Sequence, residues 1–270
     1  MDKTVFDIPN ADIAWCPGCG NFGILNIMKK ALTEMNISPR NLVFSSGIGQ
    51  AAKIPQYLQC HYFNGLHGRS LPVATAIKAV NPKLTVIAES GDGCTYGEGG
   101  NHFIHTIRRN PDIVNLVHNN MIYGLTKGQG SPTTNKGMKT SLQLNGYPLE
   151  PFNPIATALS CGATFIARAF SGDVKGSVEI LKKAVEHKGY AIIDMLQPCV
   201  TFNKLNTYKW FKENTYSIND NTDKKRAFEI SMEQESLALG VIYKGKETES
   251  FTERTGIYES NKRPLAYTPE

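Results

Sequence analysis

Short apolar runs alternate with segments of helical period over residues 20–195, and this alternation limits the fold more than any other feature of the sequence. Four apolar residues at three- and four-residue steps share one face of a helix that begins near Gly20: Leu25, Met28, Leu32 and Met35. Further helices are expected at 73–80, 101–109, 154–160 and 174–187, and strands at 42–44, 84–88, 113–117, 163–167 and 190–195. Alternation on this scale predicts an α/β fold, a parallel sheet with helices on both faces.

Two segments depart from the alternation. Residues 124–154 are rich in Gly, Ser, Thr, Asn and Pro, and so long an irregular segment in a compact domain is usually functional, so we interpret it as an active-site loop. Beyond Thr201 the sequence becomes polar and loses its period. We therefore predict a ligand-binding domain over residues 1–200, with a Cys-Pro-Gly-Cys segment near its start. The extension over 201–270 is expected to pack on this domain or on a partner subunit.

Composition excludes several classes of protein. A chain of 270 residues with 41% hydrophobic content can form a large core without disulfides. No stretch approaches the roughly 20 apolar residues of a membrane span, and the first residues lack the apolar core of a signal peptide, which predicts a cytoplasmic protein without a membrane span. The net charge of +5 is spread along the chain and aromatic residues do not interleave with basic ones, so nucleic acid is not an expected partner.

Polar motifs follow two consecutive expected strands. Gly91-Asp92-Gly93 lies where the strand at 84–88 ends, and Asn119-Asn120 follows the strand at 113–117. Each motif alone is typical of an ordinary turn or strand exit, but one β-α-β crossover brings both to the ligand-binding edge of the sheet. The glycines let the backbone approach a phosphate, and carboxylate and amide oxygens suit Mg2+. A dinucleotide-binding fold is the alternative, but its glycine fingerprint is absent.

This combination resembles the diphosphate-binding motif of thiamine diphosphate enzymes. The resemblance implies a thiamine diphosphate-binding fold over residues 1–200 and a bound Mg2+. The metal ligands that it implies are the Asp92 carboxylate, the Asn120 side chain and the backbone carbonyl of Ile122.

Five further motifs between residues 15 and 202 resemble the beta subunit of 2-oxoacid:ferredoxin oxidoreductases, especially the 2-oxoglutarate type. The motifs are Trp15-Cys16-Pro17-Gly18-Cys19-Gly20, Ser46-Gly47-Ile48-Gly49, Gly65-Leu66-His67-Gly68-Arg69, Gly99-Gly100-Asn101-His102, and Tyr123 to Gln129 followed by Ser131-Pro132-Thr133. The family implies oxidative decarboxylation of a 2-oxoacid, in which coenzyme A accepts the acyl group and ferredoxin the electrons. The products are acyl-CoA, CO2 and reduced ferredoxin.

The resemblance also assigns roles to single residues. The cofactor-binding set is Gly47, Ile48, Gly49, His67, Gly68, Asp92, Gly93, Asn120, Leu125 and Thr126. The expected catalytic set is His67, Lys53 and Lys127, with Arg69 as a further candidate, because a 2-oxoacid brings at least one carboxylate that needs a cation. The alternative for Lys53 and Lys127 is an ordinary solvated lysine.

One part of a thiamine enzyme is missing from the chain. In such enzymes a glutamate on a second, pyrimidine-binding domain activates the cofactor, and this chain has room only for the diphosphate-binding domain. The resemblance therefore implies a complex with an alpha-type subunit that supplies the pyrimidine-binding domain.

The cysteines raise a separate question. Cys16 and Cys19 have a spacing that suits zinc or an iron-sulfur cluster, whereas an isolated cysteine is more often a small buried hydrophobe. The family implies a 4Fe-4S cluster in which Cys199 is a third ligand, but Gln50 occupies the position of the fourth cysteine. Three alternatives remain open: Cys60 replaces the missing thiolate, a non-cysteine ligand completes the site, or the cluster is absent or of another type.

Two rival functions also remain open. The chain could be part of a thiamine-dependent 2-oxoacid decarboxylase that works without ferredoxin. It could instead be a non-catalytic, metal-bound electron-transfer or scaffold subunit in which Cys16 and Cys19 are structural.

Overall fold

One sheet of eight strands forms the centre of the protein. The computed structural model describes residues 4–233, 235–259 and 263–266. Along the sheet the strands run in the order β2-β1-β3-β4-β6-β5-β8-β7. Their bounds are β1 Leu42–Ser46, β2 His61–Asn64, β3 Thr85–Gly91, β4 Ile113–Asn119, β5 Phe165–Phe170, β6 Tyr190–Leu196, β7 Thr215–Ser217 and β8 Leu237–Lys244. Within the run β2-β1-β3-β4-β6-β5 each strand is parallel to the next, which confirms the main prediction of the sequence.

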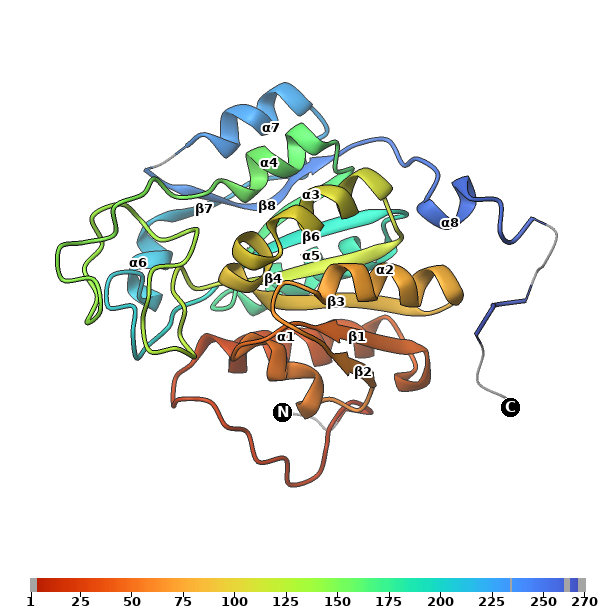
Figure 1. The fold of residues 1–270 in the computed structure, drawn as a ribbon, viewed down its shortest axis with the longest axis horizontal. Helices are drawn as coiled ribbons and strands as arrows, with labels where there is room; N and C mark the ends of the chain where they lie inside the picture. The colour runs from red at the N-terminus through yellow and green to blue at the C-terminus, as the bar shows by residue number, and fades with distance from the viewer. Residues whose placement is uncertain (1–3, 234, 260–262, 267–270) are drawn as a thin grey trace.

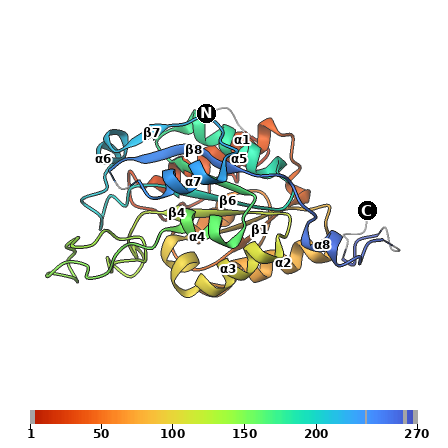
Figure 2. The ribbon, with the colours of Figure 1, turned by 90° about the horizontal axis from the view of Figure 1, so that it is seen from above.

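Helices cover both faces of this sheet (Figures 1 and 2). The longer helices are α1 Gly20–Glu34, α2 Ser70–Val80, α3 Gly100–Arg109, α4 Pro154–Cys161, α5 Val174–Glu186 and α7 Lys224–Ser231. Apolar side chains of α1 and α5 pack on one face, and those of α2, α3, α4 and α7 pack on the other. Along β3 the side chains alternate, so that Ile87 joins the first core and Val86 and Ala88 join the second.

Capping residues explain where two of the helices begin. The Asn153 side chain accepts a hydrogen bond from the backbone N–H of Ala156 at the start of α4, and Pro154 fills the first helical position, which needs no N–H donor. The Asp173 side chain accepts from the N–H of Gly176 in the same way at the start of α5. These caps lie close to the expected boundaries at 154 and 174.

The polar C-terminal segment contributes to the same sheet. Strand β8 pairs antiparallel with β5, with an irregularity between Ile166 and Ala167, and β7 pairs parallel with β8. The short helices α6 Tyr208–Glu213 and α8 Phe251–Arg254 complete this part. Part of the segment after residue 200 is therefore continuous with the core, and the sheet is mostly rather than wholly parallel.

Three irregular features lie outside the sequence prediction. The 3-10 turns η1 Pro39–Asn41 and η2 Ala51–Tyr57 flank β1, and a π-helical turn, η3 Gly93–Glu98, follows β3 directly. Residues 124–153 form no helix or strand and extend from one end of the molecule (Figure 1).

Within the part of the chain that the structure describes, no helix is both long and apolar enough to cross a membrane.

Candidate functional site

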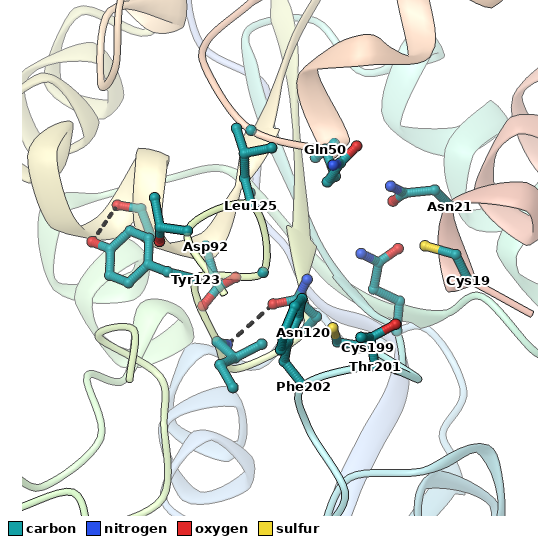
Figure 3. Close-up of a pocket in the computed structure, with 18 of the residues that line it drawn as sticks. Cys19, Asn21, Gln50, Asp92, Asn120, Tyr123, Leu125, Cys199, Thr201 and Phe202 are labelled. Atoms are coloured by element: carbon teal, nitrogen blue, oxygen red, sulfur yellow. Dashed lines mark hydrogen bonds between the residues drawn. The ribbon is translucent and has the colours of Figure 1, made fainter. Parts of the chain in front are cut away.

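A pocket lies at the carboxyl edge of the parallel strands, where the loops after four strands meet. Its lining comes from residues within 48–51 after β1, 91–94 at the end of β3, 120–126 after β4 and 197–202 after β6. His67 and residues within 15–21, around the start of α1, complete it. In Figure 3, Asp92, Tyr123 and Leu125 lie on one side of the pocket, and Cys19 and Asn21 lie on the opposite side. The two motifs that the sequence singled out therefore share one site.

Asp92 lies at the start of η3 and is almost completely buried, with 1% of its surface exposed. The Thr133 hydroxyl donates a hydrogen bond to its Oδ2 over 2.8 Å. Burial raises the pKa of Asp92 to about 6, although hydrogen bonds from Ser131 and Thr133 oppose this rise. A nearby cation would favour the charged form, so the environment of this carboxylate suits a metal ligand.

The chain reverses direction directly after β4. Met121 has a positive φ of 58°, and on either side of it Asn120 and Ile122 line the pocket. The Asn120 side-chain oxygen accepts a hydrogen bond from the N–H of Ile122 over 3.1 Å, which fixes the turn (Figure 3). Asn119 does not line this pocket, because its side-chain amide donates to Asp194 over 3.0 Å.

Glycines leave the space that the site needs. A Cβ atom on Gly93 would clash with the ring of Tyr123. Gly68 has a φ of +72°, and a Cβ there would lie 2.6 Å from the backbone carbon of Glu98. Substitution at either position would therefore require the backbone or the Tyr123 ring to move.

Cys94 organises the pocket wall, and the sequence did not predict this role. Its buried sulfur accepts hydrogen bonds from the N–H groups of Gly68, over 3.1 Å, and Ile48, over 3.5 Å. A Cβ on Gly47 would collide with the same sulfur. Gly47 and Gly68 are thus positioned behind the lining rather than in it. The position of Cys94 next to the Gly-Asp-Gly motif was the one available signal.

His67 lies at the pocket as expected, beside a carboxylate that was not expected. Its Nδ1 atom is 3.1 Å from Oε2 of Glu98, and the Tyr123 hydroxyl donates to the same oxygen over 3.2 Å. Burial and the nearby Glu98 raise the pKa of Tyr123 well above its usual range, so the hydroxyl remains a donor.

The remaining predicted residues on the same loops divide into two groups. Ile48, Gly49, Leu125 and Thr126 line the pocket, whereas Lys53 and Lys127 do not. Lys53 is half-buried in η2, and Lys127 is exposed in a left-handed backbone conformation. The described structure therefore does not bring either lysine into the lining.

Three of the four cysteines that were considered as cluster ligands lie at the pocket. Cys16, Cys19 and Cys199 line it together with Gln50, and burial raises the pKa of Cys19 to about 11, with smaller contributions from Cys199 and Cys16. Cys60 lies outside the lining, where its thiol donates to the carbonyl of Pro55 over 3.7 Å. Among the described residues, no three His, Cys, Asp or Glu side chains are arranged to hold a metal ion.

Three amide atoms around the pocket have no hydrogen-bond partner within the described structure: Oε1 of Gln50, Oε1 of Gln197 and Nδ2 of Asn21. An unsatisfied buried polar group costs about 1–3 kcal/mol. A ligand with hydrogen-bonding groups could provide these missing partners, so this part of the lining fits a polar ligand.

Comparison with known proteins supports the interpretation of this pocket as a ligand-binding site. Residues 45–195 match the family "Thiamine pyrophosphate enzyme, C-terminal TPP binding domain", and residues 199–260 match the family of the C-terminal part of the pyruvate ferredoxin oxidoreductase beta chain. The 2-oxoacid:ferredoxin oxidoreductase subunit beta of a Sulfolobus species is 41% identical over 94% of this chain and 88% of its own length. The 2-oxoglutarate oxidoreductase subunit KorB of Mycobacterium tuberculosis is 43% identical over 71% of this chain and 52% of its own.

A solved structure is similar over nearly the whole chain. It is a 2-oxoglutarate:ferredoxin oxidoreductase from Magnetococcus marinus with 2-oxoglutarate, coenzyme A and succinyl-CoA bound. The TM-score is 0.91 at 33% identity, and the match covers 98% of this chain and 93% of the other.

Proposed function

Because this chain belongs to the beta subunits of 2-oxoacid:ferredoxin oxidoreductases, we propose that it forms the diphosphate-binding half of a thiamine-dependent active site. The reaction is the coenzyme A-dependent oxidative decarboxylation of a 2-oxoacid, which gives acyl-CoA, CO2 and reduced ferredoxin. The observation that carries the proposal is the convergence of Asp92, Asn120 and Ile122 on one pocket at the edge of the sheet.

The residues present fit a Mg2+-diphosphate group. Asp92 and Asn120 would supply side-chain oxygens and Ile122 its carbonyl oxygen, while diphosphate oxygens complete the preferred oxygen shell of the metal. Gly93 leaves room for the Tyr123 ring at the pocket wall, and the unpartnered amides would add polar contacts. When bound, thiamine diphosphate supplies the carbanion chemistry that decarboxylation requires.

The proposed role of this chain's own side chains is to bind and orient the cofactor and the substrate. Ile48 and Leu125 are proposed to exclude water from the cofactor, since both are apolar and line the pocket. His67 is proposed to face the substrate side, with its Nδ1 atom 3.1 Å from Oε2 of Glu98. Lys53 and Lys127 stand outside the lining, so we propose that they recognise substrate carboxylates only within the assembled complex.

2-Oxoglutarate is the proposed substrate. Support comes from relatives named 2-oxoglutarate synthase or 2-oxoglutarate oxidoreductase and from the similar solved structure, which contains 2-oxoglutarate and coenzyme A. An alpha-type subunit is proposed to provide the pyrimidine-binding domain, and ferredoxin is proposed as the electron acceptor.

For an iron-sulfur cluster, the proposal covers three cysteine ligands rather than four. Cys16, Cys19 and Cys199 provide three thiols of suitable chemistry at one pocket, and Gln50 stands beside them with an unpartnered oxygen. These residues do not fit a cluster held by four cysteines, because no fourth thiol suited to iron completes the set among the described residues. Cys94 also lines the pocket, but its sulfur already accepts two backbone N–H groups.

Two measurements test the proposed function. Calorimetric titration of the full chain with thiamine diphosphate should show binding that depends on Mg2+. The complex with its partner subunit should reduce ferredoxin with 2-oxoglutarate and coenzyme A faster than with pyruvate or branched 2-oxoacids, and the chain alone should not turn over. Mg2+-independent binding, or strong turnover by the chain alone, would contradict the proposal.

A further inference from the structure

Several side chains of the long loop 124–153 reach the candidate metal site. The Thr134 hydroxyl donates to the carbonyl of Met121 over 2.6 Å, and Ser131 lies near Asp92. The Thr133 hydroxyl donates to Asp92 itself. Thr133 is 5% exposed, and its hydroxyl oxygen lies 2.8 Å from Oδ2 of Asp92 and 2.9 Å from Oδ1 of Asn119. A hydroxyl has only one proton to donate, and a carboxylate is the stronger acceptor, so the bond to Asp92 is favoured.

Behind Thr133 the contacts continue into the protein interior. The Asn119 side-chain amide donates to Oδ1 of Asp194 over 3.0 Å, and Asp194 also accepts from the Tyr96 hydroxyl over 3.1 Å and from Nε of Arg168 over 3.3 Å. All four of these side chains are buried, so the network has little freedom to rearrange. Thr133 therefore donates to Asp92 from a position beside this buried network, with its hydroxyl oxygen 2.9 Å from Oδ1 of Asn119.

Thr133 does not itself line the cofactor pocket. Its hydroxyl engages one oxygen of the Asp92 carboxylate, while Asn120 and Ile122 lie at the pocket. Rotation of the carboxylate would break the bond to Thr133, so this bond restricts the direction of the other oxygen. Partners of this kind, which touch the ligand residue but not the metal, typically change metal affinity about 10–100-fold when they are removed.

We propose that Thr133 is a positioning residue for metal binding: through its hydroxyl the loop 124–153 fixes the orientation in which Asp92 binds the Mg2+ of the cofactor. The inference rests on the proposed function, because it assigns a role toward the same metal. It goes beyond that function by giving the loop a direct part in building the metal site, through a residue that does not line the pocket.

Three variants separate this role from a purely structural one. Thr133→Val removes the hydroxyl and keeps the branched shape, whereas Thr133→Ser keeps the hydroxyl. Thr164→Val is the matched control, since it removes another threonine hydroxyl that contacts a side chain, 2.8 Å from His187, away from the pocket. The melting temperature without Mg2+ reports whether each variant is folded.

The experiment titrates Mg2+ into each full-length variant at saturating thiamine diphosphate. Thr133→Val should need about 10–100 times more Mg2+ for half-saturation. Thr133→Ser should restore most of the affinity, and Thr164→Val should match the wild type. Wild-type affinity in Thr133→Val, or equal loss in Thr133→Ser, would overturn the proposal. Absence of Mg2+-dependent binding in the wild type would instead overturn the proposed function together with this inference.

Discussion

Replacing Asp92 with asparagine is expected to stabilise the metal-free protein while it abolishes Mg2+-dependent cofactor binding. The carboxyl is 1% exposed, and burial raises its pKa from 3.8 to about 6. A group with a raised pKa binds its proton more tightly in the folded state than in the unfolded state. Its ionisation at neutral pH therefore opposes folding unless a metal compensates the charge.

The magnitude follows from the size of the shift. Each unit of pKa difference corresponds to about 1.36 kcal/mol, so a rise of roughly two units corresponds to about 3 kcal/mol of lost stability above pH 6. The loss develops as the pH rises from about 4 to about 6. Asparagine does not titrate, so the free energy of unfolding of Asp92→Asn should exceed that of the wild type by up to about 3 kcal/mol at pH 7. The two proteins should converge near pH 4.

Urea denaturation in the presence of a chelator, from pH 4 to pH 8, measures this difference. Glu89 is also fully buried with a raised pKa, but it is present in both proteins, so its contribution cancels. Calorimetry with thiamine diphosphate and Mg2+ then checks the loss of binding. An Asp92→Asn variant that is no more stable than the wild type at pH 7, or a difference that is constant with pH, would refute the reasoning.

Two further predictions concern the pocket wall and the cysteines. Gly68→Ala should lower the free energy of unfolding by about 2 kcal/mol or more in urea denaturation, because it combines a positive φ with a backbone clash, whereas Gly100→Ala, with open space around it, should have little effect. Iron bound by anaerobically purified protein should fall in Cys199→Ser and stay unchanged in Cys60→Ser, because Cys199 lines the pocket and Cys60 does not. Loss of iron in Cys60→Ser but not in Cys199→Ser would contradict this prediction and indicate that Cys60 is a ligand.

The sequence predicted the central strands well, for a physical reason. Strands β4 and β6 are buried along their whole length, so they appear in the sequence as mostly apolar runs, interrupted by Asn115 in β4 and Asp194 in β6. The carboxyl end of β4 was expected at residue 117, two residues too early, because His118 and Asn119 belong to the strand although they are polar. Strand β2 was missed because all four of its residues are exposed at the edge of the sheet, where burial imposes no pattern.

Prediction of the site succeeded where neighbouring strands determine it and failed where contacts are remote in sequence. Asp92 and Asn120 were expected together because β3 and β4 are adjacent in the sheet. By contrast, Thr133 and Asp92 are 41 residues apart in the sequence, and Cys94 and Ile48 are 46 residues apart. Contacts of this kind produce no periodic pattern from which they could be predicted. Glu98, which lies beside His67, was not predicted because it belongs to the irregular turn η3, which has no recognisable period in the sequence.

The buried polar groups near the pocket indicate that the site is incomplete without a ligand. His118 is fully buried, with its Nε2 2.8 Å from Oε1 of Glu89 and its Nδ1 3.0 Å from Oδ1 of Asn21, so Asn21 is held from behind. The opposite end of the same amide, Nδ2, has no described partner, and neither do the side-chain oxygens of Gln50 and Gln197. Behind the pocket, Nε2 of His118 and both carboxylate oxygens of Glu89 also lack a hydrogen bond of good geometry within the described structure, so unpaired groups lie both in the lining and behind it. Each unpaired group costs about 1–3 kcal/mol, so a bound ligand or a partner subunit that supplied the missing hydrogen bonds would stabilise the site.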